Sequence, residues 1–262
     1  MCLCDEEGHL SDRYIFVGPV LADIKNNSVV TGVRLIKKNR ILHLQIQEGK
    51  LLPYGYINQS TVHWVDVDNH KFDDADVFTM RYGRRSMALD NIQGDENHIV
   101  TGVHFEFVHD KIHLKLHVSP FDWHTGRVDH NKGYYRYTNQ ERRSKINIDN
   151  LDIPTNSYRE IGKWYHQQMY SYVEFTHSSF EKDAAQSTVP FIDIQEVANK
   201  PAVPLSSAGI YHKGRSGYGG FIAPRIWTYN FANHLSSKLP NMGDRHDDAD
   251  EEDMELLIVK LK

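Results

Sequence analysis

The sequence predicts an all-β fold, either an antiparallel β-sandwich or a β-prism-like domain, with a duplicated hairpin and few short helices. Three observations predict this class: a repeated motif, an alternation of apolar and polar residues around each copy, and a scarcity of helical periodicity. The chain has 262 residues, of which 40% are hydrophobic. A chain of this size forms a core without disulfide bonds.

The duplication is visible as two short matches that keep one spacing. The motif VTGV at residues 30–33 recurs at residues 100–103, and the pair HL at residues 43–44 recurs at residues 113–114, each time 70 residues later. Two matches in register rarely arise by chance. No third copy is evident, and this argues against a threefold prism.

The second copy predicts a hairpin with one apolar and one polar side. A two-residue loop at His109 and Asp110 pairs apolar residues with each other, namely Phe107 with Ile112, Phe105 with Leu114 and Val103 with Leu116. The opposite side pairs polar residues, Glu106 with His113 and His104 with Lys115. This division is typical of a sheet with one buried and one solvated face.

The first copy obeys the same rule. An Asn39-Arg40 loop pairs Leu35 with Leu44 and Val33 with Ile46. A shift of one residue would mix the two sides, so the register of both hairpins is a definite prediction.

Further strands are expected at residues 61–67, 170–175 and 225–231, which are short and rich in aromatic and β-branched residues. Glycines and prolines crowd residues 190–224 and predict bends there. Residues 175–193 are polar and distinctive, and we expect them to form a loop against a sheet edge.

The predicted organisation is one domain with two short flanking segments. Residues 1–10 form an N-terminal boundary segment, residues 11–235 a single β-rich domain with repeats near 29–64 and 99–134, and residues 236–262 an acidic C-terminal tail. The tail holds eight acids between Asp244 and Glu255 and is expected to be solvated.

Charge and hydropathy exclude two classes of partner. The formal net charge of -5 and the sequence pI of about 6.3 argue against nucleic-acid binding. No apolar run reaches the roughly 18 residues of a membrane span, so none is expected. The oligomeric state stays open.

Motifs for cofactors and metals are incomplete. The glycine-rich stretch at residues 209–216 has Arg215 where a phosphate-binding loop needs lysine. His109, His113 and His117 are four residues apart, but on a strand such positions are about 13 Å apart, too far to share one ion. We therefore expect no cofactor and no metal.

Aromatic residues on polar segments give the best signal for a binding site. Trp123, Tyr134, Tyr135 and Tyr137 occur with Arg136 in a stretch that is too polar to be all core. Flat rings beside hydrogen-bonding groups suit a glycan, a peptide or a partner protein. The alternative is that these rings only pack a sheet edge.

The sequence therefore predicts a non-enzymatic binding module and leaves two alternatives. A hydrolase would assemble its site in space, from Asp122, His124 and Asp129 or from His177 and Asp183. A structural matrix component would have no small ligand. The binding module is preferred because no nucleophile or acid–base motif is complete.

Two features bear on whether the protein is exported from the cell. Asn26 and Asn58 each begin an Asn-X-Ser glycosylation acceptor in a predicted turn. Cys2 and Cys4 are too close for an unstrained mutual disulfide, so either they are reduced or their partners lie outside this chain. The N-terminus shows no export signal as written.

Several strings resemble an uncharacterised family of secreted insect proteins whose C-terminal domain has no assigned function. They are SDRY at residues 11–14, VVTGVRLIKKNRILHLQIQEGKLLP at 29–53, IVTGVHF at 99–105, FTHSSFEKDAAQSTVPFID at 175–193 and KPAVPLSSAGIYHKGRSGYGGFIAPR at 200–225. Together they extend over residues 11–231, nearly the whole chain.

The resemblance implies an extracellular location and a helical N-terminal region that this chain lacks. It also implies that Cys2 and Cys4 pair with cysteines in that region, and that both glycosylation acceptors are usable. Retention of a truncated form in the cytoplasm is the alternative. The family offers no catalytic residues to carry over.

Overall fold

A computed structural model describes residues 13–67, 74–148, 170–184, 187–215 and 218–235. The chain divides into two units, Met1–Asn230 and Phe231–Lys262. The described part of the second unit contains a 3-10 helix, η6 (Phe231–His234). The fold and the sites below belong to the first unit.

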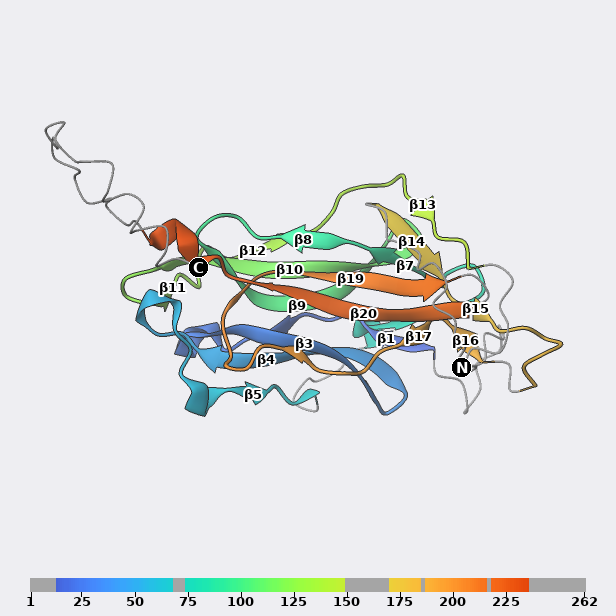
Figure 1. Cartoon of the computed structure of the whole chain (residues 1–262), viewed down its shortest axis with the longest axis horizontal. Coiled ribbons are helices and arrows are strands. Elements are labelled where there is room, and N and C mark those ends of the chain that lie inside the picture. Colours follow the sequence, from blue (N-terminus) through green and yellow to red (C-terminus); the bar gives the residue numbers. More distant parts are fainter. Residues whose placement is uncertain (1–12, 68–73, 149–169, 185–186, 216–217, 236–262) are drawn as a thin grey trace, which may run out of the picture. The chain divides into compact units, whose positions relative to one another are not determined.

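Three long hairpins form the framework of the first unit (Figure 1). Each hairpin consists of two consecutive antiparallel strands, which are β3 (Ser28–Lys38) with β4 (Ile41–Lys50), β9 (His98–Val108) with β10 (Lys111–Asp122), and β19 (Leu205–Arg215) with β20 (Tyr218–Thr228). The predicted all-β class is confirmed. The described helices are short 3-10 turns, including η1 (Ile24–Asn26), η2 (Pro53–Gly55), η3 (Gln59–Thr61) and η5 (Asp74–Asp76).

The predicted register is confirmed in both copies. Phe105 lies opposite Leu114 in the second hairpin, and Leu35 lies opposite Leu44 in the first. His104 lies opposite Lys115 on the polar side, as predicted. Both loops have two residues with positive φ, at 49° and 67° in the first and 48° and 59° in the second. This is the turn that matches the twist of paired strands.

The VTGV motif is explained by a β-bulge and a close strand contact. In each copy the threonine is the extra residue of a bulge, so the register shifts between Val30 and Gly32 in the first hairpin and at the same place in the second. A Cβ on Gly32 would lie 2.6 Å from the Cβ of Ala198, and one on Gly102 would lie 2.4 Å from Cδ2 of Leu21. Glycine therefore lets a neighbouring strand approach.

The third hairpin repeats this geometry and corrects the expectation that there is no third copy. Its register shifts between Leu205 and Ser207, so Ser206 takes the place of the bulged threonine. The Ser206 hydroxyl donates to the carbonyl of Trp227 at 3.4 Å, as Thr31 does to Gln47 at 3.4 Å and Thr101 to His117 at 3.3 Å. The sequence hides this copy because serine replaces threonine and a second bulge, between Lys213 and Arg215, changes the spacing.

Short strands connect the three hairpins in a cycle. A short strand runs parallel to the second strand of each hairpin: β1 (Tyr14–Phe16) beside β4, β7 (Ser86–Leu89) beside β10, and β17 (Phe191–Ile192) beside β20. A second short strand pairs with the first strand of another hairpin: β2 (Val20–Leu21) with β9, β8 (Asn91–Gln93) with β19, and β18 (Val197–Ala198) with β3. The result is three mixed sheets of one common plan.

Additional strands widen two of these sheets. In the first sheet β5 (His63–Trp64) pairs with β4 and β6 (Val77–Thr79) with β1. In the second sheet β11 (Arg127–Val128) and β12 (Tyr134–Arg136) pair with β10, while β13 (Ser144–Lys145) and β14 (Ser171–Glu174) extend the edge beyond β7.

One apolar core receives residues from all three hairpins. Leu35, Phe105 and Ile210 are each at most 1% exposed and belong to the same buried cluster. The outer face of each hairpin, the side away from this cluster, carries polar and aromatic residues. Three mixed sheets around one core agree with the predicted all-β class.

Residues 175–193 occupy a sheet edge, as predicted, but they are more regular than a loop. β15 (Thr176–His177) pairs with β16 (Thr188–Val189), and β17 is the outermost strand of the third sheet. Phe175 is 1% exposed and belongs to the core, which anchors the segment.

Candidate functional site

Strand β12 separates the aromatic residues that the sequence groups together. Tyr135 lies opposite His117 of β10, whereas Tyr134 lies opposite Val118 and Arg136 opposite Leu116. Because side chains alternate along a strand, Tyr135 shares the outer face with His117, and Tyr134 and Arg136 lie on the core side. The aromatic residues that the sequence places in one cluster therefore lie in two separate groups.

Tyr135 is the centre of the outer face of the second sheet. Its ring makes edge contacts with His104 and His117, with centroids 4.9 and 5.0 Å away. Its side chain is still 41% exposed. A ring held on two sides and open on its remaining surface is a platform on which a flat apolar surface can stack.

An ion pair between Lys115 and Glu106 lies on the same outer face, beside Tyr137. Nζ of Lys115 lies 4.6 Å from the ring centre of Tyr137, which is 53% exposed. The same ammonium group lies 2.6 Å from Oε2 of Glu106. The two charges balance, and the aliphatic stem and ring provide further apolar contact surface.

The two histidines on this face favour their neutral forms. Burial, with a smaller contribution from Lys115, lowers the pKa of His104 to about 4. Burial also lowers the pKa of His117. Nδ1 of His104 is buried and has no hydrogen-bond partner among the described residues, which agrees with the penalty on charging this ring.

Buried hydroxyl groups fix the orientation of His117. Oγ1 of Thr101 lies 2.8 Å from Nδ1 of His117 and 3.0 Å from Oγ of Ser119. Thr101 and Ser119 are fully buried. The bulge thus positions an imidazole beside Tyr135, and the platform is rigid.

Tyr134 and Arg136 form a separate polar group with Asp95. The Tyr134 hydroxyl donates to the Asp95 carboxylate, and this bond raises the pKa of Tyr134. Nη1 of Arg136 lies 3.3 Å from Oδ1 of Asp95, and its Nε donates to the carbonyl of Gln93. These contacts hold β12 to the loop after β8.

Trp123 lies in the turn after β10, beside Tyr54. The rings are 6.1 Å apart with an edge-on geometry, and the Trp123 carbonyl accepts from the Tyr54 amide at 2.7 Å. Tyr54 also contacts the His124 ring at 6.0 Å. Trp123 is therefore part of a loop contact apart from the Tyr135 face.

The carboxylates proposed for a hydrolase cap turns. Asp122 accepts from the amide and hydroxyl of Thr125, both at 2.7 Å, and these bonds lower its pKa. Asp129 pairs with Lys132 at 3.1 Å, and hydrogen bonding to Lys132 lowers its pKa. Both groups favour the ionised form, whereas a general acid needs a raised pKa.

His177 and Asp183 also have local contacts. The Ser178 hydroxyl donates to Asp183, and Nδ1 of His177 bonds with the Ser178 carbonyl at 2.6 Å. The amide of Ser187 donates to the same carboxylate at 3.1 Å. Asp183 thus closes the loop between β15 and β16.

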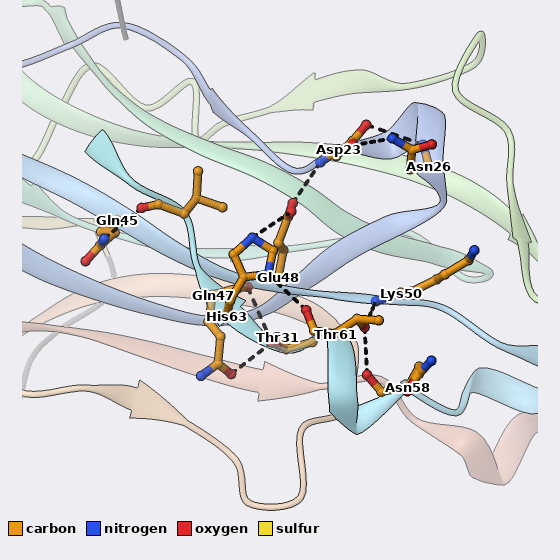
Figure 2. A network of polar contacts seen from close by, with 11 residues as sticks. Asp23, Asn26, Thr31, Gln45, Gln47, Glu48, Lys50, Asn58, Thr61 and His63 are labelled. Atoms are coloured by element: carbon orange, nitrogen blue, oxygen red, sulfur yellow. Dashed lines mark hydrogen bonds and ion pairs between the residues drawn. The ribbon is translucent and has the colours of Figure 1, made fainter. Parts of the chain in front are cut away.

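The first sheet carries a polar network around Glu48 (Figure 2). Glu48 is 6% exposed, accepts from the Asp23 amide at 2.8 Å and lies 3.4 Å from Nε2 of His63. Thr61 Oγ1 accepts from the Lys50 amide at 2.9 Å. These bonds tie η1, η3 and β5 to β4, and so position Trp64 next to the hairpin.

Asp90, Arg143 and His113 form a buried polar cluster at one end of the second sheet. Arg143 donates two hydrogen bonds to Asp90 at 2.6 and 2.8 Å, and Nδ1 of His113 lies 3.6 Å from Oδ2 of Asp90. This cluster fastens the chain before β13 to the sheet and closes that end of the face.

A described pocket lies away from these residues. A pocket of about 420 Å³ is lined by β1, the end of the first hairpin and β17, including Tyr14, Phe175 and Phe191. The sequence-predicted site residues do not line it.

The glycosylation acceptors lie in turns, as predicted. Asn26 ends η1 and donates from Nδ2 to Asp23 at 2.5 Å. Asn58 precedes η3, and its Oδ1 accepts from the amide and hydroxyl of Ser60. Asn26 is exposed and Asn58 half-buried. Cys2 and Cys4 lie outside the described residues.

Sequence reasoning missed His104, His117 and Lys115 as site residues, although the alternation placed His104 and Lys115 on the polar side. The repeated motif gives a signal for His117 alone: Thr101 contacts its imidazole, as Thr31 of the first copy contacts Gln47. The pairing of β12 with β10 leaves no such signal in the sequence.

The described ranges hold neither a metal-binding cluster nor a membrane-spanning helix. There, no group of three or more His, Cys, Asp and Glu side chains is arranged to hold a metal ion. Within the same ranges no helix has the length and apolar character needed to cross a bilayer.

A family model matches part of the chain. Residues 1–46 are similar to a family described as a domain of unknown function (DUF4803). The match ends within β4, before the second hairpin begins. No curated protein matches the chain.

Proposed function

We propose that this chain is a non-enzymatic binding module that holds a neutral glycan on the outer face of its second sheet. The observation that carries the proposal is the Tyr135 ring, which is flanked by His104 and His117 and remains 41% exposed. A sugar ring has one apolar face of C–H groups that stacks on such a platform, while its hydroxyls bond to polar neighbours.

The charges of the face support a neutral ligand. Lys115 and Glu106 neutralise each other, and both histidines are uncharged at neutral pH because burial lowers their pKa values. An acidic ligand would need an excess of cations, which this face does not offer. Uncharged imidazoles both donate and accept, as hydroxyl groups require.

A glycan fits this face better than the other two ligand classes that the sequence predicts. A stable protein partner covers about 800 Å² around a dry apolar centre. Here the exposed aromatic groups are Tyr135 and Tyr137, and titratable groups surround them. If a peptide or protein binds instead, substitutions outside this face should weaken its binding as well.

The hydrolase alternative receives no support from its proposed residues. Asp122 and Asp129 have lowered pKa values and cap turns. Catalysis at a glycosidic bond requires one carboxyl group that stays protonated near neutral pH.

The proposal also places the chain outside the cell. Its support is the position of both Asn-X-Ser acceptors in surface turns, with Asn26 exposed. Expression in the secretory pathway should give two glycan-dependent mobility steps, one lost in Asn26→Gln and one in Asn58→Gln. A product of unmodified mass would contradict this placement.

The binding test is a glycan array with the full chain and matched variants. We expect neutral glycans to bind and Tyr135→Ala to weaken binding by about tenfold or more, as the loss of one stacked ring predicts. Tyr56→Ala is the control, because Tyr56 is 70% exposed but lies before η3, away from this face.

Trp123→Ala distinguishes the face from the loop. Loss of binding in Trp123→Ala with none in Tyr135→Ala would assign the site to the turn after β10. An array without signal on any neutral glycan would reject the proposal. Circular dichroism of each variant verifies that the fold is kept.

A further inference from the structure

The first sheet has an aromatic platform at the place that corresponds to Tyr135. Trp64 of β5 lies opposite Gln47 of β4, just as Tyr135 of β12 lies opposite His117 of β10. Gln47 and His117 are both paired with the glycine after the bulge. The extra strand therefore presents its ring at the same position in both sheets.

Polar contacts hold the first platform and keep its charge balanced. The guanidinium of Arg34 lies 4.2 Å from the ring centre of Trp64. Its Nε donates to Oε1 of Gln45 at 2.7 Å, and its Nη1 lies 2.6 Å from Glu196. An amide and an ion pair thus surround a half-buried indole, where imidazoles and an ion pair lie around and near Tyr135.

The third sheet carries its ring on the hairpin itself. Trp227 of β20 lies opposite Ser207, next to the third bulge, and is 39% exposed. The guanidinium of Arg225 lies 4.8 Å from the Trp227 ring centre and 6.0 Å from that of Tyr211. Arg225 also donates from Nε to Oδ1 of Asn91 at 2.7 Å, which fixes it between the rings.

All three rings lie close to the bulge of their hairpin, on the extra strand in the first two sheets and on the hairpin itself in the third. Each lies on the outer face of a hairpin sheet beside the bulge, and each combines an aromatic ring with a held cation and side-chain amides or imidazoles. Because the sheets surround one core, the platforms face away from one another.

We propose that the chain binds neutral glycan at three separate sites, centred on Trp64, Tyr135 and Trp227. The inference rests on the proposed function and adds to it the number of sites. Three outward-facing sites cannot all contact one short oligosaccharide, so the natural ligand is a polysaccharide that the chain binds at several points or cross-links. Multiple weak contacts then add up to strong retention on the polymer.

The test counts bound oligosaccharides. The probes are neutral tetrasaccharides of glucose, of mannose and of N-acetylglucosamine, titrated into the full chain by isothermal calorimetry, with native mass spectrometry to count bound molecules. We expect three bound molecules per chain with at least one probe. Trp64→Ala, Tyr135→Ala and Trp227→Ala should each reduce the number to two, and Tyr56→Ala should keep three.

Each outcome decides a different claim. A single bound molecule that Tyr135→Ala abolishes overturns the three-site inference and leaves the proposed function intact. Two bound molecules, or a variant at Trp64 or Trp227 that keeps three, also overturn the three-site inference. No binding of any probe rejects both. Trp64→Phe and Trp227→Phe, which retain a ring, should restore binding if stacking is the cause.

Discussion

The first and second hairpins share a framework but differ in what they present to solvent. Thr31 and Thr101 occupy the same bulge 70 residues apart, yet Thr31 bonds to the amide of Gln47 and Thr101 to the imidazole of His117. Arg34 in the first hairpin is replaced by His104 in the second. At these two positions the first outer face thus has an amide and a guanidinium, whereas the second has two imidazoles.

The buried sides differ far less. Equivalent core positions hold apolar residues in both hairpins, namely Val33 and Val103, Leu35 and Phe105, Leu44 and Leu114, and Ile46 and Leu116. The comparison teaches that the repeat preserves the core and the bulge, and leaves the outer face free to acquire a function. The bulge is what places a different side chain at the same point of each sheet.

The largest expected effect concerns the shared core. Phe105→Ala should lower the free energy of unfolding by about 3–5 kcal/mol, and Leu35→Ala by about 2–5 kcal/mol, because each leaves a cavity at a residue that is at most 1% exposed. Both variants should shift the same cooperative urea transition, since both residues belong to one cluster.

Two resolved transitions, with one variant affecting each, would show that the hairpins fold separately. Tyr56→Ala serves as the surface control and should change the free energy of unfolding by about 0.5 kcal/mol or less. Fluorescence and circular dichroism monitor the transition together, so that disagreement between them would reveal an intermediate.

Much of the fold follows from local patterns in the sequence. Alternation around VTGV predicted both hairpins, and a two-residue loop fixed their register. The third hairpin was not predicted as a copy because only the Ser206 hydroxyl reproduces the repeated motif there. The exchange of β2, β8 and β18 between hairpins depends on tertiary packing, which leaves no periodic signal.

The site was predictable only in part. The sequence indicated Tyr135 and Tyr137 correctly as exposed aromatics, but it grouped them with Trp123 and Tyr134, which lie elsewhere. Closeness in sequence misleads here, because neighbouring residues of a strand point to opposite sides. His104 joins Tyr135 only through the pairing of β12 with β10 and of β10 with β9.

A second prediction tests whether the second outer face titrates. His104 has a folded-state pKa of about 4, below its unfolded value of 6.5, so the unfolded chain binds more protons between these values. Stability should therefore fall as the pH drops from about 6.5 to about 4, by roughly 1–2 kcal/mol after allowance for partial solvent access. Lys115 and His117 disfavour the charged ring further, while Glu106 opposes them.

The measurement is the difference in pH dependence between chain and variant, because carboxylates titrate in the same range. His104→Gln should lose less stability than the unmodified chain between pH 7 and pH 4. Arg34→Gln is the matched variant in the first hairpin and should keep the full slope, since a guanidinium does not titrate there. Equal slopes in all three proteins would contradict the burial of His104.

The smallest expected effect distinguishes the two bulges. Thr101→Val keeps the shape of the side chain but removes a hydroxyl that contacts His117 and the fully buried Ser119, so it should cost about 1–2 kcal/mol. Thr31→Val should cost about 1 kcal/mol or less, because half-buried Gln47 can turn to solvent. Urea denaturation at pH 7 measures both. A larger loss in Thr31→Val would mean that the fold depends on the first bulge more than on the second, and the rigidity ascribed to the Tyr135 platform would then need another source.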